Sequence, residues 1–371
     1  MSIDTVAVAL GERAYDIHIG EGILEHAGAH LSLLLQRPRI IIVTDENVAA
    51  AQGARLKAGL DAEHIQYEFI TLAPGEQTKS FSTLEKLTGA LLDLDVERQD
   101  LVLAFGGGVI GDLTGFACAI VRRGCRFAQA PTTLLAQVDS AVGGKTAINV
   151  TQGKNLIGAF HQPIMVLADI AALETLPVRE LRAGYAEVVK YGLIADRSFY
   201  NWLETNGETL LSADGRAERQ NAVKKSCEAK AAIVAVDERE HGARALLNFG
   251  HTFGHALEGA FGYSDKLLHG EAVALGMSLA FDYSVRVGMC AEKDAASVKS
   301  HITKSGLPAT MADLKHKPAS AAELMRLMLQ DKKREAGKLT LILAKSIGDT
   351  HIVKDVDPND VLEFLKEKTA A

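Results

Sequence analysis

Residues 100–120 read DLVLAFGGGVIGDLTGFACAI and join a strand pattern to a helix pattern through a run of glycines. Gly106, Gly108 and Gly111 satisfy the spacing G-x-G-x-x-G. Without a Cβ at these positions, backbone N–H groups and a helix N-terminus can approach a pyrophosphate. The same letters also describe a plain tight turn, so context has to decide between the two.

Strand and helix patterns alternate around this stretch. Residues 39–45, 64–72 and 100–105 are apolar, β-branched runs, and residues 80–96 place apolar side chains at helical spacing after a Ser. Residues 5–20 predict an opening hairpin. This alternation predicts βαβ units and a mostly parallel, Rossmann-like α/β domain.

The pattern changes near Pro177. Beyond it, long segments rich in Ala, Leu and Glu predict helices, for example at residues 186–194, 222–236, 251–261 and 271–288. Only residues 337–349 again have a strand pattern. We therefore expect an α/β domain over residues 1–177 and a helical domain over residues 178–371.

Bulk composition excludes several classes of protein. The net charge of -7 does not favour nucleic acid or an anionic membrane surface as a partner. The four cysteines form no C-x-x-C pair, which indicates reduced thiols in a cytoplasm. No apolar run reaches the ~18 residues of a membrane span, and the start lacks a signal-peptide pattern. We expect a cytoplasmic protein.

The glycine loop departs from the usual dinucleotide fingerprint. It follows about the third βα unit, and no acidic residue stands ~20 positions downstream, where a ribose ligand is expected. Asp45, however, ends the strand pattern at residues 39–45. Because parallel strand ends meet at one edge of a sheet, Asp45 can reach the ribose of a dinucleotide whose pyrophosphate binds at Gly107 and Gly108.

Residues 143–146 read GGKT, which resembles the end of a phosphate-binding P-loop. The first glycine of that motif is missing, so a nucleoside triphosphatase is excluded. Lys145 still has the chemistry of an anion contact, and Lys154 and Asn155 add a cation and a donor.

Residues 248–271 contain the three histidines that suggest a metal site. After Asn248, a plausible N-cap, His251 and His255 are four residues apart and share a helix face. Thr252 stands where a helical metalloprotease has its Glu, so a protease is disfavoured. His269 begins the next predicted helix.

A catalytic zinc ion takes about three protein ligands, often with a carboxylate among them. Glu187 is the best carboxylate, three residues before Lys190 in an otherwise apolar segment. Spacing alone leaves open whether His251 is paired with His255 or with His269. The alternative without a metal is that these histidines pack or cap within helices, and that Glu187 forms a surface ion pair.

Several motifs together resemble the 3-dehydroquinate synthase family. They occur in that family's order and spacing: PGEQTK (74–79), FGGGVIGD (105–112), PTTLLAQVDSAVGGKTAIN (131–149), GKN (153–155), AGYAEVVKYGLI (183–194), DEREHGARALLNFGHTFGHALE (237–258), LLHGEAVALGM (267–277) and DKKREAGKLTLIL (331–343). The resemblance covers most of the chain.

This resemblance implies an NAD-binding α/β domain and an all-α metal-binding domain, with the active site in the cleft between them. It implies a lyase of the shikimate pathway, within the sugar phosphate cyclase superfamily, that converts 3-deoxy-D-arabino-heptulosonate 7-phosphate (DAHP) into 3-dehydroquinate and phosphate. The family uses NAD+, which is not consumed, and Zn2+ or Co2+. Its steps are a transient oxidation, phosphate elimination, re-reduction and an aldol ring closure. Such enzymes are usually homodimers.

The resemblance also assigns residues. The implied metal ligands are Glu187, His251 and His269. Implied residues of the reacting centre are Asp139, Lys190, His255, which faces the phosphate, and Glu240 as a supporting carboxylate. Implied substrate contacts in the pocket are Lys145, Asn155, Asn248 and His255. Lys230 and Arg244 are implied for the substrate carboxylate and Lys338 for the phosphate. Arg123 is implied to reach the site of a neighbouring subunit. Implied nucleotide contacts are Asp45, Glu76, Lys79, Gly107, Gly108, Val109, Ile110, Gly111, Asp112, Thr132, Thr133, Lys145, Lys154 and Thr175.

Three other functions remain as alternatives. An inosose or valiolone synthase would act on a sugar phosphate without a carboxylate, and Lys230 with Arg244 favours DAHP over such a substrate. A metal-dependent polyol dehydrogenase would release NADH. A non-enzymatic binding protein would leave the convergence of so many polar groups unexplained.

Overall fold

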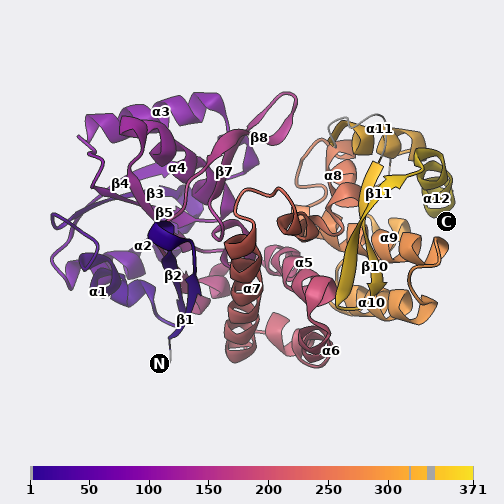
Figure 1. Ribbon diagram of the computed structural model, residues 1–371. Coiled ribbons are helices and arrows are strands. Elements are labelled where there is room, and N and C mark those ends of the chain that lie inside the picture. The colour runs from indigo at the N-terminus through magenta and orange to yellow at the C-terminus, as the bar shows by residue number, and fades with distance from the viewer. Residues whose placement is uncertain (1–2, 317–318, 332–338, 371) are drawn as a thin grey trace. The chain divides into compact units, whose positions relative to one another are not determined.

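The computed structural model describes residues 3–316, 319–331 and 339–370 (Figure 1). The chain divides into two compact units, one made of residues 1–177 and 219–239, the other of residues 178–218 and 240–371. The first division falls at Pro177, where the sequence pattern changes. Residues 219–239, which the sequence pattern groups with the helical half, belong to the first unit.

The described part of the first unit contains a seven-stranded sheet with the order β1-β2-β9-β6-β5-β3-β4. Its strands are β1 (Asp4–Val8), β2 (Tyr15–Gly20), β3 (Arg39–Asp45), β4 (Gln66–Leu72), β5 (Leu101–Gly106), β6 (Arg126–Pro131) and β9 (Met165–Asp169). β1 pairs antiparallel with β2, and every other pairing is parallel. The opening hairpin and the parallel sheet that the sequence predicts are confirmed.

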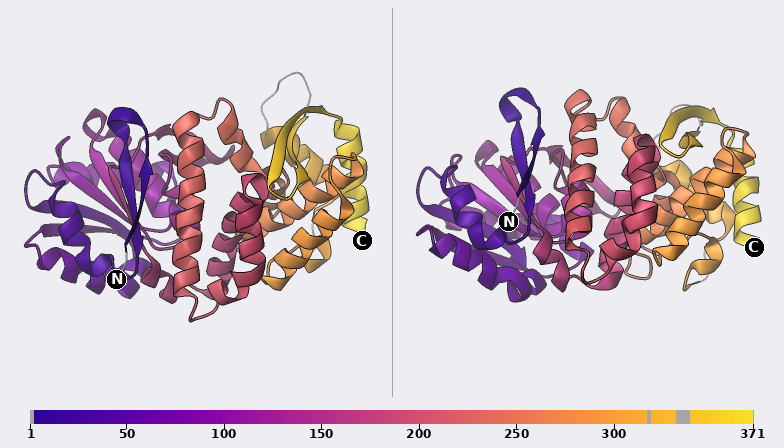
Figure 2. Two further views of the ribbon diagram at one scale, coloured as in Figure 1. Left: turned by 60° about the horizontal axis from the view of Figure 1, so that its bottom comes forward. Right: turned by 90° about the horizontal axis from the view of Figure 1, so that it is seen from below.

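Helices cover both faces of this sheet (Figure 2). They are α1 (Ala27–Ser32) and α2 (Glu46–Asp61) on one face, and α3 (Phe81–Asp93) and α4 (Gly108–Ile120) on the other. The unit also contains most of α7 (Arg216–Val236). Successive side chains of a strand point to opposite faces. On β3, Ile40 and Ile42 pack in the core of α1 and α2, whereas Ile41 and Val43 pack in the core of α3 and α4. This is the doubly wound arrangement expected of a Rossmann-like unit.

The parallel register brings the carboxyl ends of the central strands to one edge. Thr44 of β3 is level with Phe105 of β5, so Asp45 lies beside Gly106, and Gly106 is level with Pro131 of β6. A two-stranded antiparallel hairpin, β7 (Lys145–Val150) with β8 (Gly153–Phe160), packs against α4.

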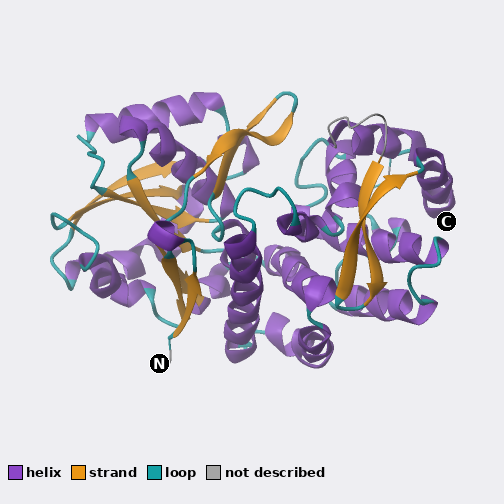
Figure 3. Ribbon diagram, in the orientation of Figure 1, coloured by secondary structure: helices purple, strands orange, loops and turns teal. Residues whose placement is uncertain are grey.

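The second unit is rich in helices (Figure 3). They are α5 (Val178–Ala195), α6 (Arg197–Leu211), α8 (His251–Ala260), α9 (His269–Arg286), α10 (Glu292–Lys304), α11 (Ala321–Asp331) and α12 (Pro358–Ala370). An antiparallel hairpin of β10 (Leu339–Ser346) and β11 (Asp349–Val356) lies in this otherwise helical unit, where the sequence has its last strand pattern. Across the described ranges, we find no helix with both the length and the apolar character needed to cross a lipid bilayer.

Buried aromatic groups anchor α5 to α6 and α10. The Tyr185 hydroxyl of α5 is 3.0 Å from Nε2 of His301 on α10, and the Tyr200 ring of α6 meets the His301 ring edge-on at 5.5 Å. Burial lowers the pKa of His301 to about 4. A neutral imidazole is therefore part of the packing that fixes α5.

We expect His301 to make the unfolding free energy depend on pH. The unfolded chain binds a proton at this imidazole below pH ~6.5, whereas the folded chain stays neutral until the pKa of about 4. The contribution of the neutral His301 imidazole to the unfolding free energy is fully present above pH ~6.5. It falls by up to about 3 kcal/mol as the pH drops to ~4. Urea titrations at several pH values measure the effect.

The matched variant is His301→Gln, which keeps a hydrogen-bonding group opposite Tyr185 but does not titrate. Its unfolding free energy should fall less steeply between pH ~6.5 and ~4 than that of the parent. Equal slopes for both proteins would contradict a neutral, buried His301.

Candidate active site

The glycine loop lies at the carboxyl edge of the first unit's sheet, directly between β5 and α4. A Cβ at Gly106 would stand 2.7 Å from Cγ1 of Ile110, and a Cβ at Gly111 would stand 2.6 Å from Oε1 of Gln129. A side chain at Gly106 would therefore collide with the first turn of α4, and one at Gly111 would displace the buried amide of Gln129. The helix begins at Gly108, so its N-terminal N–H groups face outward from the strand edge, as an anion site requires.

Residues predicted to bind the nucleotide gather near the start of α4. Lys79 is buried, and its Nζ lies 2.6 Å from Oδ2 of Asp112 and 2.5 Å from Oδ1 of Asn155. Lys154 lies 4.0 Å from Glu76. Burial raises the pKa of Asp112, and the Lys79 charge opposes that rise only in part. The fold thus brings five predicted residues together from three separate segments.

Other predicted nucleotide residues also have local structural roles. The Asp45 carboxylate accepts a hydrogen bond of 3.0 Å from Val48 N and so caps α2. Thr133 Oγ1 accepts one of 3.1 Å from Ala136 N. Thr175 Oγ1 accepts one of 2.7 Å from Nε2 of the buried Gln52. A capping role for Asp45 was not anticipated from the sequence.

The predicted substrate contact Lys230 and the predicted reacting-centre residue Asp139 form a pair in the first unit. Lys230 on α7 is buried, and its Nζ lies 2.6 Å both from Oδ1 and from the carbonyl oxygen of Asp139. Lys230 is therefore not a surface charge. Asp139 belongs to a short π-helical turn, Ala136–Ser140.

The remaining predicted cations of this unit are exposed. Lys145 is the first residue of β7 and Arg123 follows α4 in a left-handed conformation with φ 65°. Lys338 lies outside the described residues, so its expected contact with phosphate stays a prediction.

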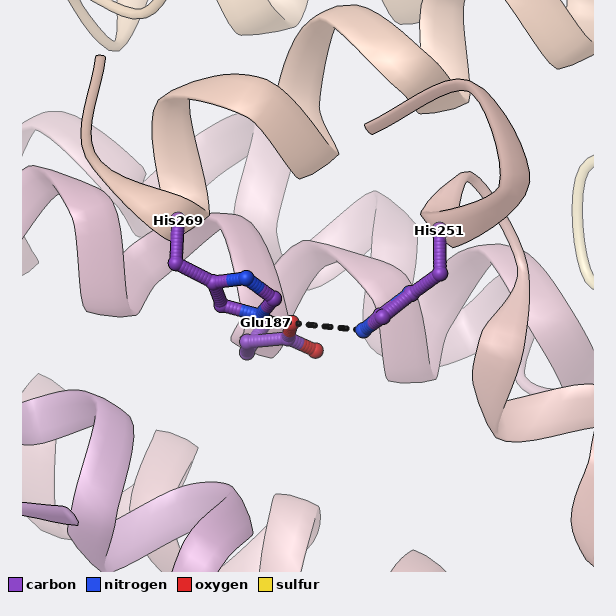
Figure 4. A group of neighbouring side chains, drawn as sticks. All are labelled: Glu187, His251 and His269. Carbon is purple, nitrogen blue, oxygen red and sulfur yellow. Dashed lines mark ion pairs between the residues drawn. The ribbon is translucent and has the colours of Figure 1, made fainter. Parts of the chain in front are cut away.

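In the second unit, the side chains of Glu187, His251 and His269 converge (Figure 4). Glu187 lies in the middle of α5, and the two histidines are the first residues of α8 and α9. Nε2 of His251 and Nε2 of His269 lie 3.4 and 3.3 Å from the same carboxylate oxygen of Glu187. The three ligand atoms are all within 4.8 Å of one another.

Both imidazoles are oriented through their other nitrogen. Nδ1 of His251 lies 3.1 Å from the carbonyl oxygen of Phe249, and Nδ1 of His269 lies 2.9 Å from Oε2 of the buried Glu258. These acceptors place a proton on Nδ1 of each ring, so that Nε2, which faces Glu187, is the nitrogen that can bind a metal ion. Metal-binding histidines are usually held in this way.

The charges around Glu187 also fit a divalent cation. Both of its carboxylate oxygens are buried without a hydrogen bond to any described residue, although Lys190 forms an ion pair with one of them. Burial alone would raise the pKa of Glu187, but Lys190 and the histidines hold it well below its usual range. Burial would likewise lower the pKa of His269, yet Glu258 and Glu187 raise it to about 10. Two carboxylates thus make this position strongly attractive to positive charge.

His255 is not part of this triad. Its ring centroid lies 5.3 Å from that of His251 and 6.1 Å from that of His269. A second group of possible ligands, His255 with Glu258 and His269, shares His269 with the triad. Within the described ranges, no such group contains both His251 and His255. The geometry therefore supports His251 with His269, one of the two pairings that spacing left open.

Two expectations about this region need correction or completion. Asn248 is not the N-cap of α8, because Gly250 occupies that position. Gly250 has a φ of 79°, and a Cβ on it would lie 2.8 Å from the backbone N of Met277, so only glycine fits there. Asn248 Nδ2 instead donates to Glu240 Oε1 at 2.9 Å. The carboxylate that supports a histidine is Glu258, which sequence reasoning missed although it lies seven residues after His251 on the same helix face.

Two solved structures of sugar phosphate cyclases resemble the whole chain. The 2-epi-5-epi-valiolone synthase from Streptomyces hygroscopicus subsp. jinggangensis, with NAD+ and Zn2+ bound, has a TM-score of 0.88 and 28% identity over 98% of both chains. A 2-deoxy-scyllo-inosose synthase complexed with carbaglucose-6-phosphate, NAD+ and Co2+ has a TM-score of 0.86 and 26% identity, over 98% of this chain and 100% of that chain. Fold and site together define a sugar phosphate cyclase.

Within this class, residues 69–183 and 184–334 match the family models of the 3-dehydroquinate synthase N-terminal and C-terminal domains. The 3-dehydroquinate synthase of Roseobacter denitrificans is 54% identical over 365 residues, which cover 98% of each chain. The chain belongs to the 3-dehydroquinate synthase family. Its activity is that of a lyase of aromatic biosynthesis, as the resemblance implied.

Substitution of the histidines tests the triad. We expect His251→Ala and His269→Ala to lose bound metal, and His255→Ala to keep it but lose turnover. Elemental analysis of the purified proteins measures metal content independently of activity. An empty site in His255→Ala would contradict this assignment and favour the pairing at i, i+4.

Substitution of Glu258 tests the support of His269. Glu258→Gln removes the charged acceptor opposite Nδ1, so we expect metal affinity to fall ~10–100-fold. Glu240→Gln is the matched control, because Glu240 Oε1 accepts a hydrogen bond of 2.9 Å from Asn248 Nδ2. Metal competition with a chromogenic chelator gives both affinities, and equal losses in the two variants would exclude a specific role of Glu258.

Proposed function

We propose that this chain converts DAHP into 3-dehydroquinate and phosphate through residues that each of its units brings together. The observation that carries this proposal is the buried Glu187 carboxylate facing Nε2 of His251 and of His269 in a chain of this family. In this proposal Glu187, His251 and His269 hold Zn2+ or Co2+. The glycine loop and the residues around Lys79 hold NAD+.

The cofactor and the metal divide the chemistry. When bound, NAD+ supplies reversible hydride transfer and the divalent cation supplies Lewis-acid polarisation of a substrate oxygen. The first unit's own contribution is binding and orientation. In the proposal, N–H groups at Gly107 to Asp112 bind the pyrophosphate, Asp45 binds a ribose, and Glu76, Thr132, Thr133, Lys154 and Thr175 complete the nucleotide contacts.

Charged side chains of both units orient the substrate in this proposal. Arg244 is buried, and the fixed fork of N–H donors on a guanidinium matches the two oxygens of a substrate carboxylate. Lys230, held by Asp139, is assigned to the same carboxylate. Lys145, Asn155, Asn248 and Lys338 are assigned to the polar groups and the phosphate. Positioning of the substrate supplies much of the rate enhancement.

Proton and phosphate chemistry falls to the groups around the triad. Lys190 forms an ion pair with Glu187, and in the proposal its Nζ stabilises negative charge that develops on a substrate oxygen. His255 follows His251 by one helical turn and is assigned to the leaving phosphate. Bound phosphate can itself accept the proton in its own elimination. Glu240 supports Asn248 through the hydrogen bond between them.

The proposal includes a cytoplasmic homodimer in which Arg123 of one subunit approaches the substrate of the other. The support for Arg123 is its exposed, left-handed position after α4 and the family resemblance. The net charge of -7 supports the absence of nucleic acid and anionic membranes as partners.

A phosphate-release assay tests this function. We expect the protein with NAD+ and Zn2+ or Co2+ to release phosphate from DAHP with no net formation of NADH, because the hydride is returned to the product. Exhaustive chelation should abolish release, and added metal should restore it. Full activity in protein shown by elemental analysis to hold no metal would contradict the proposal.

The same assay separates the alternatives. A seven-carbon sugar phosphate without a carboxylate has no partner for Lys230 and Arg244, so we expect little turnover with it. Turnover of that substrate in preference to DAHP would favour a valiolone synthase. Stoichiometric accumulation of NADH would favour a polyol dehydrogenase.

A further inference from the structure

Asn149 lies at an irregular point of the β7–β8 hairpin. Ile148 pairs with Ile157, but Val150 pairs with Gly153, so the register shifts around Asn149. The segment from Lys154 to Leu156 therefore bulges out of the ladder opposite Asn149. A β-bulge leaves residues without their usual ladder partners and changes the direction of side chains.

The Asn149 side chain replaces the missing ladder contacts. Its Oδ1 accepts a hydrogen bond of 3.0 Å from the backbone N of Asn155, whose φ is 55°. A left-handed conformation is unfavourable for most residues and is tolerated best by Asn, Asp and Gly. The side-chain amide of Asn149 thus helps to hold Asn155 in a conformation that the hairpin alone would not select.

The other polar groups of Asn149 reach the turn that precedes α3. Its Nδ2 donates to Oε1 of Glu76 at 2.7 Å, and its backbone N donates to the carbonyl oxygen of Lys79 at 2.8 Å. Since Lys79 Nζ in turn binds Asn155 Oδ1, these contacts form a closed ring. One residue is therefore bonded to Glu76, to Lys79 and to Asn155.

We propose that Asn149 is a positioning residue that fixes Glu76, Lys79 and Asn155 relative to one another. This inference rests on the proposed function, which assigns Glu76 and Lys79 to NAD+ and Asn155 to the substrate. Asn149 itself contacts neither cofactor nor substrate in this scheme. Both hydrogen bonds of its side chain go to residues of the proposed site, which a role in hairpin stability alone would not require.

The first test reads the positions of these residues without any ligand. In the full-length protein, Asn149→Ala should speed amide hydrogen exchange in peptides covering residues 74–80 and 145–160, because the contact with Asn155 N and the tie to Glu76 are lost. Asn206→Ala is the matched control, since Asn206 also donates one side-chain hydrogen bond, to the Trp202 carbonyl in α6. Unchanged exchange in Asn149→Ala would overturn the inference.

The second test reads cofactor binding by isothermal titration with NAD+. We expect Asn149→Ala to raise the Kd about tenfold, equivalent to about 1.4 kcal/mol. Asn206→Ala should leave the Kd unchanged, and metal content should not change in either variant. If Asn149 acts through Glu76, Asn149→Ala should have a smaller effect in a Glu76→Gln background than in the parent.

The outcomes separate this inference from the proposed function. If Glu76→Gln weakens NAD+ binding but Asn149→Ala does not, the positioning role is wrong and the nucleotide site stands. Additive effects of the two substitutions would show that Asn149 does not act on NAD+ binding through Glu76, and would overturn that part of the inference. If the parent binds no NAD+, the proposed function is wrong, and hydrogen exchange alone then decides whether Asn149 orders the three residues.

Discussion

The carboxylate of Glu187 is the constraint on which the second unit depends. Burying a lone carboxylate costs several kcal/mol, so the fold must surround it with positive charge. Lys190 supplies one charge from the same helix, and His251 and His269 approach from the first residues of two other helices. A shift of one turn in α8 or α9 would separate these groups. The buried packing of α5 against α6 and α10 keeps Glu187 itself in place.

Local patterns predicted the scaffold well because they depend on short-range chemistry. The β3 strand at Arg39–Asp45, the helix within residues 80–96 and the change at Pro177 follow directly from periodicity and composition. The glycine loop was also placed correctly between a strand and a helix. The strand pattern before the glycines and the helix pattern after them gave this placement, because the glycine motif alone also fits a plain turn.

Contacts between segments distant in sequence were harder to predict. Spacing along one helix could not say which second histidine faces Glu187, because that depends on how α8 and α9 pack. Glu258 and Asn149 were missed because they act through hydrogen bonds and belong to no recognisable metal or nucleotide motif. Glu258 contacts His269, whereas Asn149 contacts Glu76, Asn155 and Lys79. Family resemblance supplied the triad, whereas these supporting residues emerge only from coordinates.

The order of the two units along the chain bears on how the protein is made. The first unit ends its main run at Pro177 but is completed by residues 219–239. Helix α7 contacts the very start of the chain, where Lys224 Nζ lies 2.6 Å from Oδ1 of Asp4, and Cys227 Sγ donates to the Gln137 carbonyl at 3.3 Å. A growing chain therefore holds an unfinished sheet domain until α7 has left the ribosome. Contacts between segments so far apart in the chain slow folding and leave apolar surface exposed until they form. Truncation at Pro177 would remove α7, so it is a poor route to an isolated nucleotide-binding domain.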